Sequence, residues 1–194
     1  MILSLFLRNK EFHVSCGEFE HIYKVTESRE MADNIPFFLK ETLDHIDFSK
    51  CSKVIFSSGP ASFTTARIMN SLVKGLKISA PNLDFWGISN FLTYLYIASQ
   101  HNSEGSIALP TMRGDYFYAA FSEKKLSDIE IFSDLNQNTI LDSNEIFDNI
   151  NMSTIQEKLS DDNIVKMNPN YIQNSLDINY GFTPEYKSTP TVHR

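Results

Sequence analysis

The stretch at residues 58–68 constrains the fold most, because a buried strand passes there directly into a long helix. Residues 53–57 are β-branched and aromatic, which is typical of a buried strand. In residues 63–78 the apolar side chains recur at helical spacing. Between them, Gly59 can adopt backbone angles that a side chain forbids, and Pro60 fixes its own φ angle. The sequence therefore predicts a strand-to-helix junction.

The start of this helix is the first candidate binding site. Ser62 and Thr64 can each cap amide groups of the first turn. A helix N-terminus can hold an anion or the backbone of a partner. Arg67 follows within the next turn, where its guanidinium could grip an anion or a partner carboxylate through two parallel hydrogen bonds. The alternatives, which the sequence leaves open, are that the hydroxyls are simple caps and that Arg67 forms an ion pair within its own lobe.

Hydrophobic periodicity predicts an α/β chain. The first half is predicted to hold strands at 2–7, 12–16 and 22–26, a helix at 33–46 with Pro36 in its first turn, the strand at 53–57 and the helix at 63–78. The second half is predicted to hold a helix at 89–100, a loop at 101–105, strands at 106–109, 116–121 and 129–132, and short helices at 144–150 and 171–178. Periodicity alone identifies the class and no particular fold.

Composition and charge limit the function. The chain has 194 residues and a formal net charge of -7, which disfavours independent binding to a phosphate backbone. No apolar run approaches the ~20 residues of a membrane span, and residues 1–7 are too short for a signal peptide, so a cytoplasmic protein is expected. Cys16 and Cys51 lack the spacing of metal ligands, and we expect reduced thiols in the core.

Sequence motifs for independent catalysis are missing. None of the five histidines forms a pair at four-residue spacing that could bind a metal from one helix face. His13 and His21 fall in predicted strands, where surface positions are expected. The chain contains neither a Walker-type phosphate loop nor a Gly-x-Ser-x-Gly elbow. We therefore assign no catalytic and no metal-ligating residue.

Both long helices carry more apolar side chains than a single core-facing stripe requires. On the helix at 33–46 the excess includes Phe37 and Phe38. The helix at 63–78 has two adjacent stripes, namely Ile68, Leu72 and Leu76 in one and Ala66, Met69 and Val73 in the other. Such a helix is either sandwiched inside its own domain or docked against another chain. The residues predicted to bind a partner are Phe37, Phe38, Ala66, Met69 and Val73.

Several of these stretches resemble one family. Residues 58–68 are similar to the Gly-Pro-Gly-Ser-Phe-Thr-Gly-x-Arg-Ile motif of the bacterial TsaB (YeaZ) proteins, residues 86–91 to its Gly-Val-Ser-(Ser/Thr)-Leu and residues 113–119 to its Met-Gly-Glu-Val-Tyr-x-Ala. The first match consists of Gly59, Pro60, Ser62, Phe63, Thr64, Arg67 and Ile68. Ala61 and Thr65 replace two family glycines. The resemblance spans most of the chain.

The resemblance implies a fold and a division into lobes. TsaB proteins share the actin-like ATPase (ribonuclease H-like) fold, an α/β fold of two lobes. The expected division here is an N-terminal lobe at 1–100, a smaller and shortened C-terminal lobe at 101–186 and a mobile tail at 187–194.

The resemblance also implies a function and partners. The chain would be a non-catalytic scaffold subunit of the complex that places threonylcarbamoyl on tRNA adenosine. It would bind and activate the TsaD-like catalytic subunit through its two long helices, and a TsaE-like ATPase would join this pair. The same helices could instead form a homodimer. The chain would contact tRNA only indirectly.

The resemblance also bears on nucleotide binding, with evidence for it and against it. The motif residues Gly59 to Thr64 and Arg67 could contact a nucleotide or another anion, and weak binding of ATP or ADP at the lobe interface is conceivable. However, Phe6 and Leu7 stand where relatives carry Asp-Thr, and neither can ligate a cation or donate a side-chain hydrogen bond to phosphate. Hydrolysis is therefore not expected. The alternative function is a divergent actin-like enzyme, either a nucleotide hydrolase or a peptidase.

Overall fold

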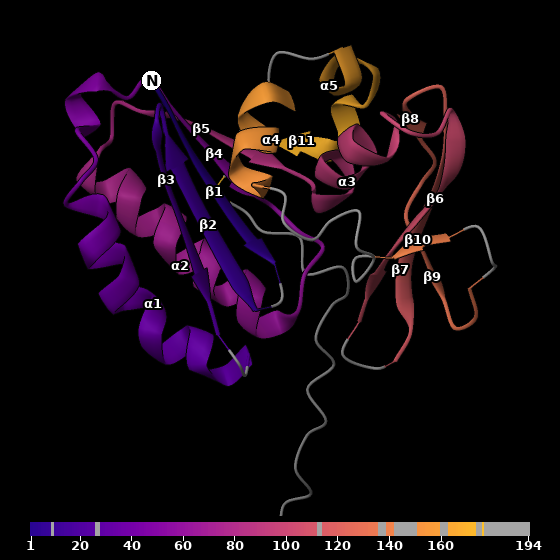
Figure 1. Ribbon diagram of the computed structural model, residues 1–194, viewed down its shortest axis with the longest axis horizontal. Helices are drawn as coiled ribbons and strands as arrows, with labels where there is room; N and C mark the ends of the chain where they lie inside the picture. The colour runs from indigo at the N-terminus through magenta and orange to yellow at the C-terminus, as the bar shows by residue number, and fades with distance from the viewer. Residues whose placement is uncertain are drawn as a thin grey trace, which may run out of the picture.

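In the computed structural model two β-sheets lie beside each other, with helices between them and on the outer face of the first sheet (Figure 1). The structure describes residues 1–8, 10–25, 28–111, 114–135, 139–141, 151–159, 163–173 and 176. The helices are α1 (Ser28–Leu43), α2 (Phe63–Ser79), α3 (Asn90–Ala98), α4 (Met152–Leu159) and α5 (Asn163–Met167), with short 3-10 turns η1 (Phe48–Lys50) and η3 (Pro169–Tyr171). The α/β class predicted from periodicity is confirmed.

The first sheet has six strands, and β1 lies in its interior. In spatial order the strands are β11 (Ile172–Gln173), β5 (Asp84–Ile88), β4 (Lys53–Ser57), β1 (Ile2–Arg8), β2 (Glu11–Cys16) and β3 (Phe19–Lys24). Strands β1, β4 and β5 are parallel, whereas β1, β2 and β3 form an antiparallel meander. The nearly continuous apolar sequences of β1 and β4 are typical of strands that are covered on both faces.

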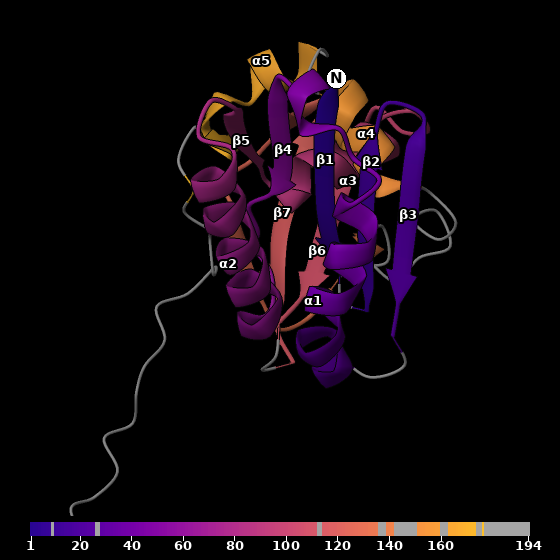
Figure 2. The same cartoon turned by 90° about the vertical axis from the view of Figure 1, so that its left-hand side faces the viewer.

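Alternate side chains of β1 enter two different cores. Leu3, Leu5 and Leu7 pack into the core beneath α1 and α2, which lie next to each other on one face of the sheet (Figure 2). Phe6 belongs to the opposite core, together with Phe91 of α3 and apolar residues of α4 and the second sheet. Because side chains alternate between the two faces of a strand, this one strand joins both cores.

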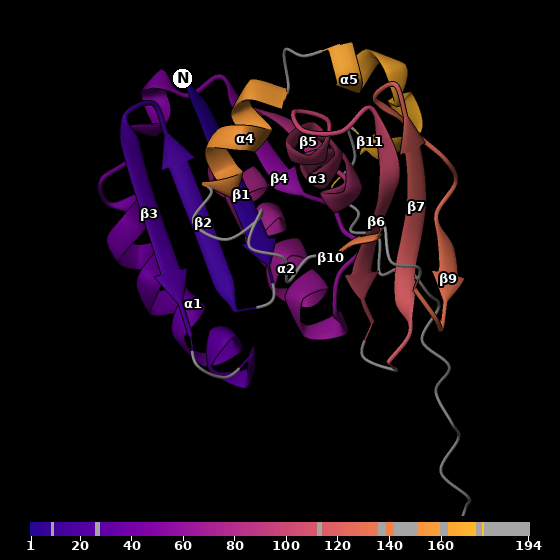
Figure 3. The ribbon, with the colours of Figure 1, turned by 45° about the vertical axis from the view of Figure 1, so that its right-hand side comes forward.

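Within the described residues, the second sheet has five strands and lies beyond α3 (Figure 3). Its strands are β6 (Glu104–Pro110), β7 (Tyr116–Ser122), β8 (Lys125–Leu126), β9 (Glu130–Phe132) and β10 (Thr139–Leu141). They are ordered β10-β6-β7-β8, and β9 also pairs with β7. Strands β6 and β7 form an antiparallel pair, whereas β10 runs parallel to β6.

After the second sheet the chain returns to the first. The hydroxyl of Ser4 in β1 donates to the backbone carbonyl of Ser153 in α4 over 2.8 Å, and β11 pairs with β5. The amide nitrogen of Asn168 donates to the carbonyls of Lys124 and Ile164, each at 2.9 Å, and thereby links the second sheet to α5. The segment at 151–173, which the sequence assigned to the second lobe, therefore contacts both sheets.

Most element predictions in the first half agree with the structure, and several in the second half do not. The strand at 53–57 is confirmed as β4, and the helix predicted at 63–78 is observed as α2. The helix predicted at 33–46 is observed as α1, but it begins at Ser28 and ends at Leu43. Pro36 therefore lies inside the helix rather than in its first turn. Strand β5 and helix α4 were missed. The helix predicted at 171–178 was wrong at its start, where β11 forms.

Two of the predicted segments cannot be compared with the structure. The helix predicted at 144–150 and the tail at 187–194 lie outside the described residues.

We expect Gly87→Ala to destabilise the protein, because a Cβ atom at this buried position of β5 has no room. It would lie 2.9 Å from Cγ of Gln173, 3.0 Å from Cζ of Phe56 and 3.0 Å from Cβ of Ser58. Overpacking of this kind typically lowers the free energy of unfolding by about 1–3 kcal/mol. Urea denaturation followed by circular dichroism measures it.

Gly75→Ala is the matched control. Gly75 lies inside α2, and a Cβ atom there meets no other atom within 4 Å. Replacing glycine by alanine inside a helix should raise the free energy of unfolding by roughly 0.5–1 kcal/mol. Equal effects of the two substitutions would contradict the packing of β11 and β4 around Gly87.

Candidate functional site

The turn at residues 58–62 has the predicted strand-to-helix geometry. Gly59 has a φ angle of 93°, in the region that favours glycine, and the Gly59–Pro60 peptide bond is cis. Ser62 is the N-cap of α2, because its Oγ accepts a hydrogen bond from the backbone N–H of Thr65 over 3.3 Å. Of the two predicted caps, Ser62 is thus the one used, whereas Thr64 is exposed on the first turn.

This turn packs against the start of α3. The backbone N–H of Asn90 and the hydroxyl of Ser89 donate to the carbonyl of Gly59 over 2.8 Å and 3.1 Å. The side-chain amide of Asn90 donates to the carbonyl of Pro60 over 3.1 Å. The structure therefore brings together the two stretches that the sequence singled out, 58–68 and 86–91. Both carbonyls therefore accept hydrogen bonds from within the chain, and Gly59 and Pro60 connect the turn to α3.

The other motif residues lie on the surface of α2. The guanidinium carbon of Arg67 lies 5.4 Å from the centre of the Phe63 ring, in a cation–π contact. Within the described part of the chain, no carboxylate forms an ion pair with Arg67. The intralobe ion pair considered as an alternative is thus not found among these residues, and Arg67 and Thr64 both border a groove.

This groove lies between α1 and α2 and has a volume of about 520 Å³. Most of its lining is apolar or hydroxylic, with one cationic side chain. The lining residues are Ile35, Pro36, Leu39, Thr64, Arg67, Ile68, Ser71 and Leu72. Two large apolar residues of the same helices are strongly exposed, Phe37 at 72% and Ile78 at 82%. We call the groove together with Phe37 and Ile78 the α1–α2 face.

Four of the five residues predicted to bind a partner lie instead beneath these helices. Phe38 is 5% exposed, Ala66 and Met69 are each 1% exposed and Val73 is fully buried. All four belong to the core between the helices and the first sheet. The prediction for them was wrong because a helical pattern reveals two stripes without showing which one faces the sheet. Only Phe37 has the predicted exposure.

The other stripe of α2 is the one that reaches the surface. Ile68 and Leu72 are only partly buried and line the groove. Leu76, the third member of that stripe, is buried. On α1, Ile35 and Leu39 lie four residues apart and line the opposite side of the groove. This pair can be recognised in the sequence only when the side of α1 that faces the sheet is known.

Phe6 and Leu7, which stand at the position of the family's first phosphate loop, are buried on opposite sides of β1. Phe6 packs edge-to-face against Tyr94, with ring centres 6.2 Å apart. Leu7 lies in the core beneath α1 and α2, and its backbone N–H donates to Oγ of Ser57 over 3.2 Å. Both side chains at this position therefore belong to the hydrophobic cores.

A buried histidine next to Phe6 was not expected from the sequence. His13 is 2% exposed, so the predicted surface position was wrong, because helices cover this face of β2 as well. Its Nε2 lies 3.1 Å from Oε2 of Glu11, whose other oxygen lies 2.6 Å from Nζ of Lys24. Nδ1 of His13 has no hydrogen-bond partner among the described residues.

The two members of this pair respond differently to burial. Burial lowers the pKa of His13 below its usual value, and the hydrogen bond that its ring donates to Glu11 opposes this shift only in part. For Glu11, burial alone would raise the pKa, but hydrogen bonds from Lys24 and His13 bring it below its ordinary value. At neutral pH the pair is therefore a neutral imidazole beside a carboxylate.

Within the described ranges, no group of three or more His, Cys, Asp or Glu side chains is arranged to hold a metal ion. Across the same ranges, none of the helices has both the length and the apolar character needed to cross a membrane.

Comparison with known proteins identifies the class of fold. No family model matches the sequence, and no curated protein matches it at a significant level. Among solved structures, the chain is similar to YeaZ from Pseudomonas aeruginosa, with a TM-score of 0.55 and 16% sequence identity over 68% of this chain and 66% of that chain. It is also similar to an uncharacterized protein described as similar to peptidase YeaZ from Pseudomonas aeruginosa, with a TM-score of 0.53 and 14% identity over 68% of this chain and 65% of that one.

The chain thus spans just under two thirds of the length of these YeaZ structures. At such low identity the likeness concerns the fold. It confirms the actin-like fold that the sequence resemblance implied.

The buried imidazole makes the stability of the protein depend on pH. Since the pKa of His13 is lower in the folded state than its usual value of about 6.5, unfolded chains bind a proton below this pH that folded chains do not. The free energy of unfolding should therefore decrease as the pH falls below 6.5, by up to about 1.4 kcal/mol per pH unit until the folded-state pKa is reached.

The variant His13→Gln should lose this part of the slope, whatever its stability at neutral pH. Urea denaturation between pH 5 and pH 8 measures both proteins. The lowered pKa of Glu11 affects the free energy of unfolding only at lower pH. The stability that ionised Glu11 contributes is lost as the pH falls through a folded-state pKa below 4.5. An unchanged slope in the variant would show that His13 is not the group responsible.

Proposed function

We propose that this chain is a non-catalytic scaffold subunit that docks through its α1–α2 face on a TsaD-like catalytic protein of the tRNA threonylcarbamoyladenosine pathway. The observation that carries the proposal is the apolar α1–α2 face itself. Two further observations support the proposal. The chain shares its fold with YeaZ, and its residues 58–68 resemble the motif of the TsaB family.

The α1–α2 face has the composition of a protein-binding surface. Its groove is lined mainly by apolar side chains of both helices, and Phe37 of α1 exposes most of its ring to water. Aromatic residues and arginine are enriched in the cores of protein interfaces. Lys40 and Lys74, both exposed on the same helices, provide a charged rim. A single exposed apolar residue is ordinary, whereas a groove with exposed aromatic and aliphatic neighbours indicates an interaction site.

The partner in this proposal is an apolar helical surface of the TsaD-like subunit. Helices dock into grooves between helices by placing side chains at intervals of three and four residues. Leu39, Ile68 and Leu72 offer the matching apolar walls. A second copy of this chain could use the same face, and the homodimer would then compete with the heteromer.

The net charge of the chain and the residues at the end of β1 support the roles that we propose for the other subunits. With a net charge of -7 the chain has little electrostatic affinity for tRNA, so tRNA would be held by the other subunits. The TsaE-like ATPase would act on the assembled pair. Phe6, buried where relatives carry an acid, leaves catalysis to the partner.

Reconstitution tests this function. The TsaD-like protein of the same source, tRNA, ATP and the threonylcarbamoyl donor are combined with and without this chain. We expect modified tRNA only when the chain is present. Equal modification by the TsaD-like protein alone would contradict the scaffold function.

Phe37→Glu should weaken association with the TsaD-like protein at least about tenfold, because it replaces an exposed aromatic side chain of the proposed interface by a charge that the bound partner would have to desolvate. The side chain is 72% exposed, so the fold should remain intact. Light scattering and titration calorimetry measure the association, and circular dichroism checks the fold.

Ile131→Glu provides the matched control. Ile131 is 58% exposed on β9 of the second sheet, away from α1 and α2, and should tolerate the same charge without loss of binding. If both variants bind equally well, the interface lies elsewhere. If Ile131→Glu alone loses binding, the second sheet is the docking surface.

A further inference from the structure

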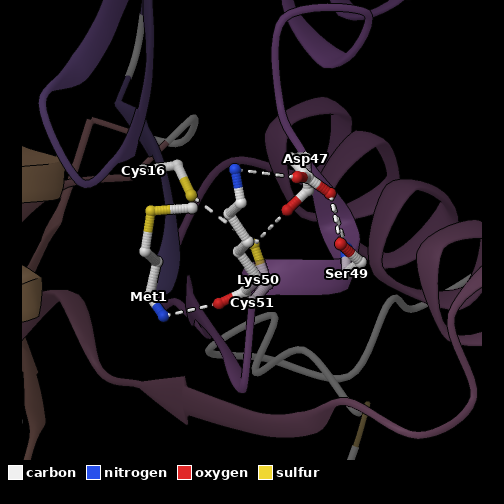
Figure 4. A network of polar contacts seen from close by, with 6 residues as sticks. All are labelled: Met1, Cys16, Asp47, Ser49, Lys50 and Cys51. Atoms are coloured by element: carbon white, nitrogen blue, oxygen red, sulfur yellow. Dashed lines mark hydrogen bonds and ion pairs between the residues drawn. The ribbon is translucent and has the colours of Figure 1, made fainter.

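The two cysteines lie close together at one end of the first sheet. Cys16 ends β2, and Cys51 precedes β4. Their Sγ atoms are 3.5 Å apart, although the residues are separated by 35 positions in the sequence. Both are free thiols, 5% and 9% exposed. In Figure 4 a dashed line joins the sulfur atom of Cys16 to that of Cys51, and the side chain of Met1 lies next to Cys16.

From this geometry we propose that Cys16 and Cys51 form a reversible intramolecular disulfide when the protein meets a two-electron oxidant such as a hydroperoxide. The sulfurs need to approach by only about 1.5 Å to reach the S–S bond length of about 2.0 Å. These are the only two cysteines in the chain, so no other thiol of the chain competes for either of them.

The surroundings hold the two thiols in place. The ammonium group of Met1 donates to the carbonyl of Lys50 over 2.7 Å, and the backbone N–H of Ser52 donates to the carbonyl of Met1 over 2.9 Å. Sγ of Cys51 lies 3.7 Å from the carbonyl of Asp47. Asp47 in turn caps η1 by accepting from Ser49. The segment that carries Cys51 is thus fixed next to β2.

Met1 packs against the turn that follows Cys16. Its side chain passes over Gly17, with Sδ only 3.1 Å from the position of a Cβ atom at that residue, and it is itself 47% exposed. Gly17 has a φ angle of 62°, which lets the chain turn tightly after Cys16.

The reaction balances without any further component. A thiolate attacks one oxygen of hydrogen peroxide, which forms a sulfenic acid and releases hydroxide. The second thiol attacks the sulfenic sulfur, the S–S bond forms and water leaves. In total, two thiols and one peroxide give one disulfide and two waters. Burial and the contact with Cys51 raise the pKa of Cys16 to about 12, so the reaction is expected to be slow at neutral pH.

The disulfide would close a loop that contains β3, α1 and η1. Closing a loop of this length restricts the unfolded chain, so the oxidised protein should melt at a temperature higher by roughly 5–10 °C. The bond would also tie both flanks of α1 to the sheet. The proposal does not depend on the proposed function.

The test treats the folded full-length chain with hydrogen peroxide and then maps its peptides by mass spectrometry without reduction. We expect a monomer that has lost both free thiols and the mass of two hydrogen atoms, with the Cys16 peptide joined to the Cys51 peptide. Dithiothreitol should restore both thiols and the original melting temperature.

The variant Cys51→Ser is the matched control. It keeps Cys16 in place, and we expect no cross-link in it, only unreacted thiol or oxygen adducts. If the wild-type protein also gives separate oxygen adducts, unchanged thiols or a disulfide between two chains, the proposal is wrong. A cross-linked monomer that melts at a lower temperature would contradict the proposed fit of the bond to the fold.

Discussion

The burial of β1 on both faces is the constraint on which the rest of the structure depends. Leu3, Leu5 and Leu7 fill the core under α1 and α2, whereas Ser4 and Phe6 face α3 and α4. Because one strand takes part in both cores, the helix pair and the second sheet are held by the same short segment. The outer side of α1 and α2 then has no further layer of the described chain against it, and its groove stays open.

The motif turn fixes this arrangement at the carboxyl end of β4. Gly59 and Pro60 offer their carbonyls to α3, and Ser62 starts α2, so one turn positions two helices on opposite faces of the sheet. This gives the shared residues of the 58–68 stretch a structural role that needs no ligand. It also explains why Thr64, Arg67 and Ile68, which follow the cap, reach the groove.

The sequence predicted the first half of the chain well where local chemistry decides the outcome. The strand at 53–57, the helix after it and its Ser62 cap depend on neighbouring residues, and all three are observed. Positions that depend on tertiary packing were missed. Met69 and Val73 could be told from Ile68 and Leu72 only by knowing where the sheet lies, and His13 is buried because distant helices cover β2. The proximity of Cys16 and Cys51 likewise arises from strand pairing across 35 positions.

Hydrogen–deuterium exchange of the chain, with and without the TsaD-like subunit, shows directly whether the α1–α2 face binds that subunit. We expect slower exchange in the residues of α1 and α2 that border the groove, with β7 and β9 of the second sheet unchanged. Protection confined to the second sheet, or a stable complex without any change in α1 and α2, would contradict binding through this face.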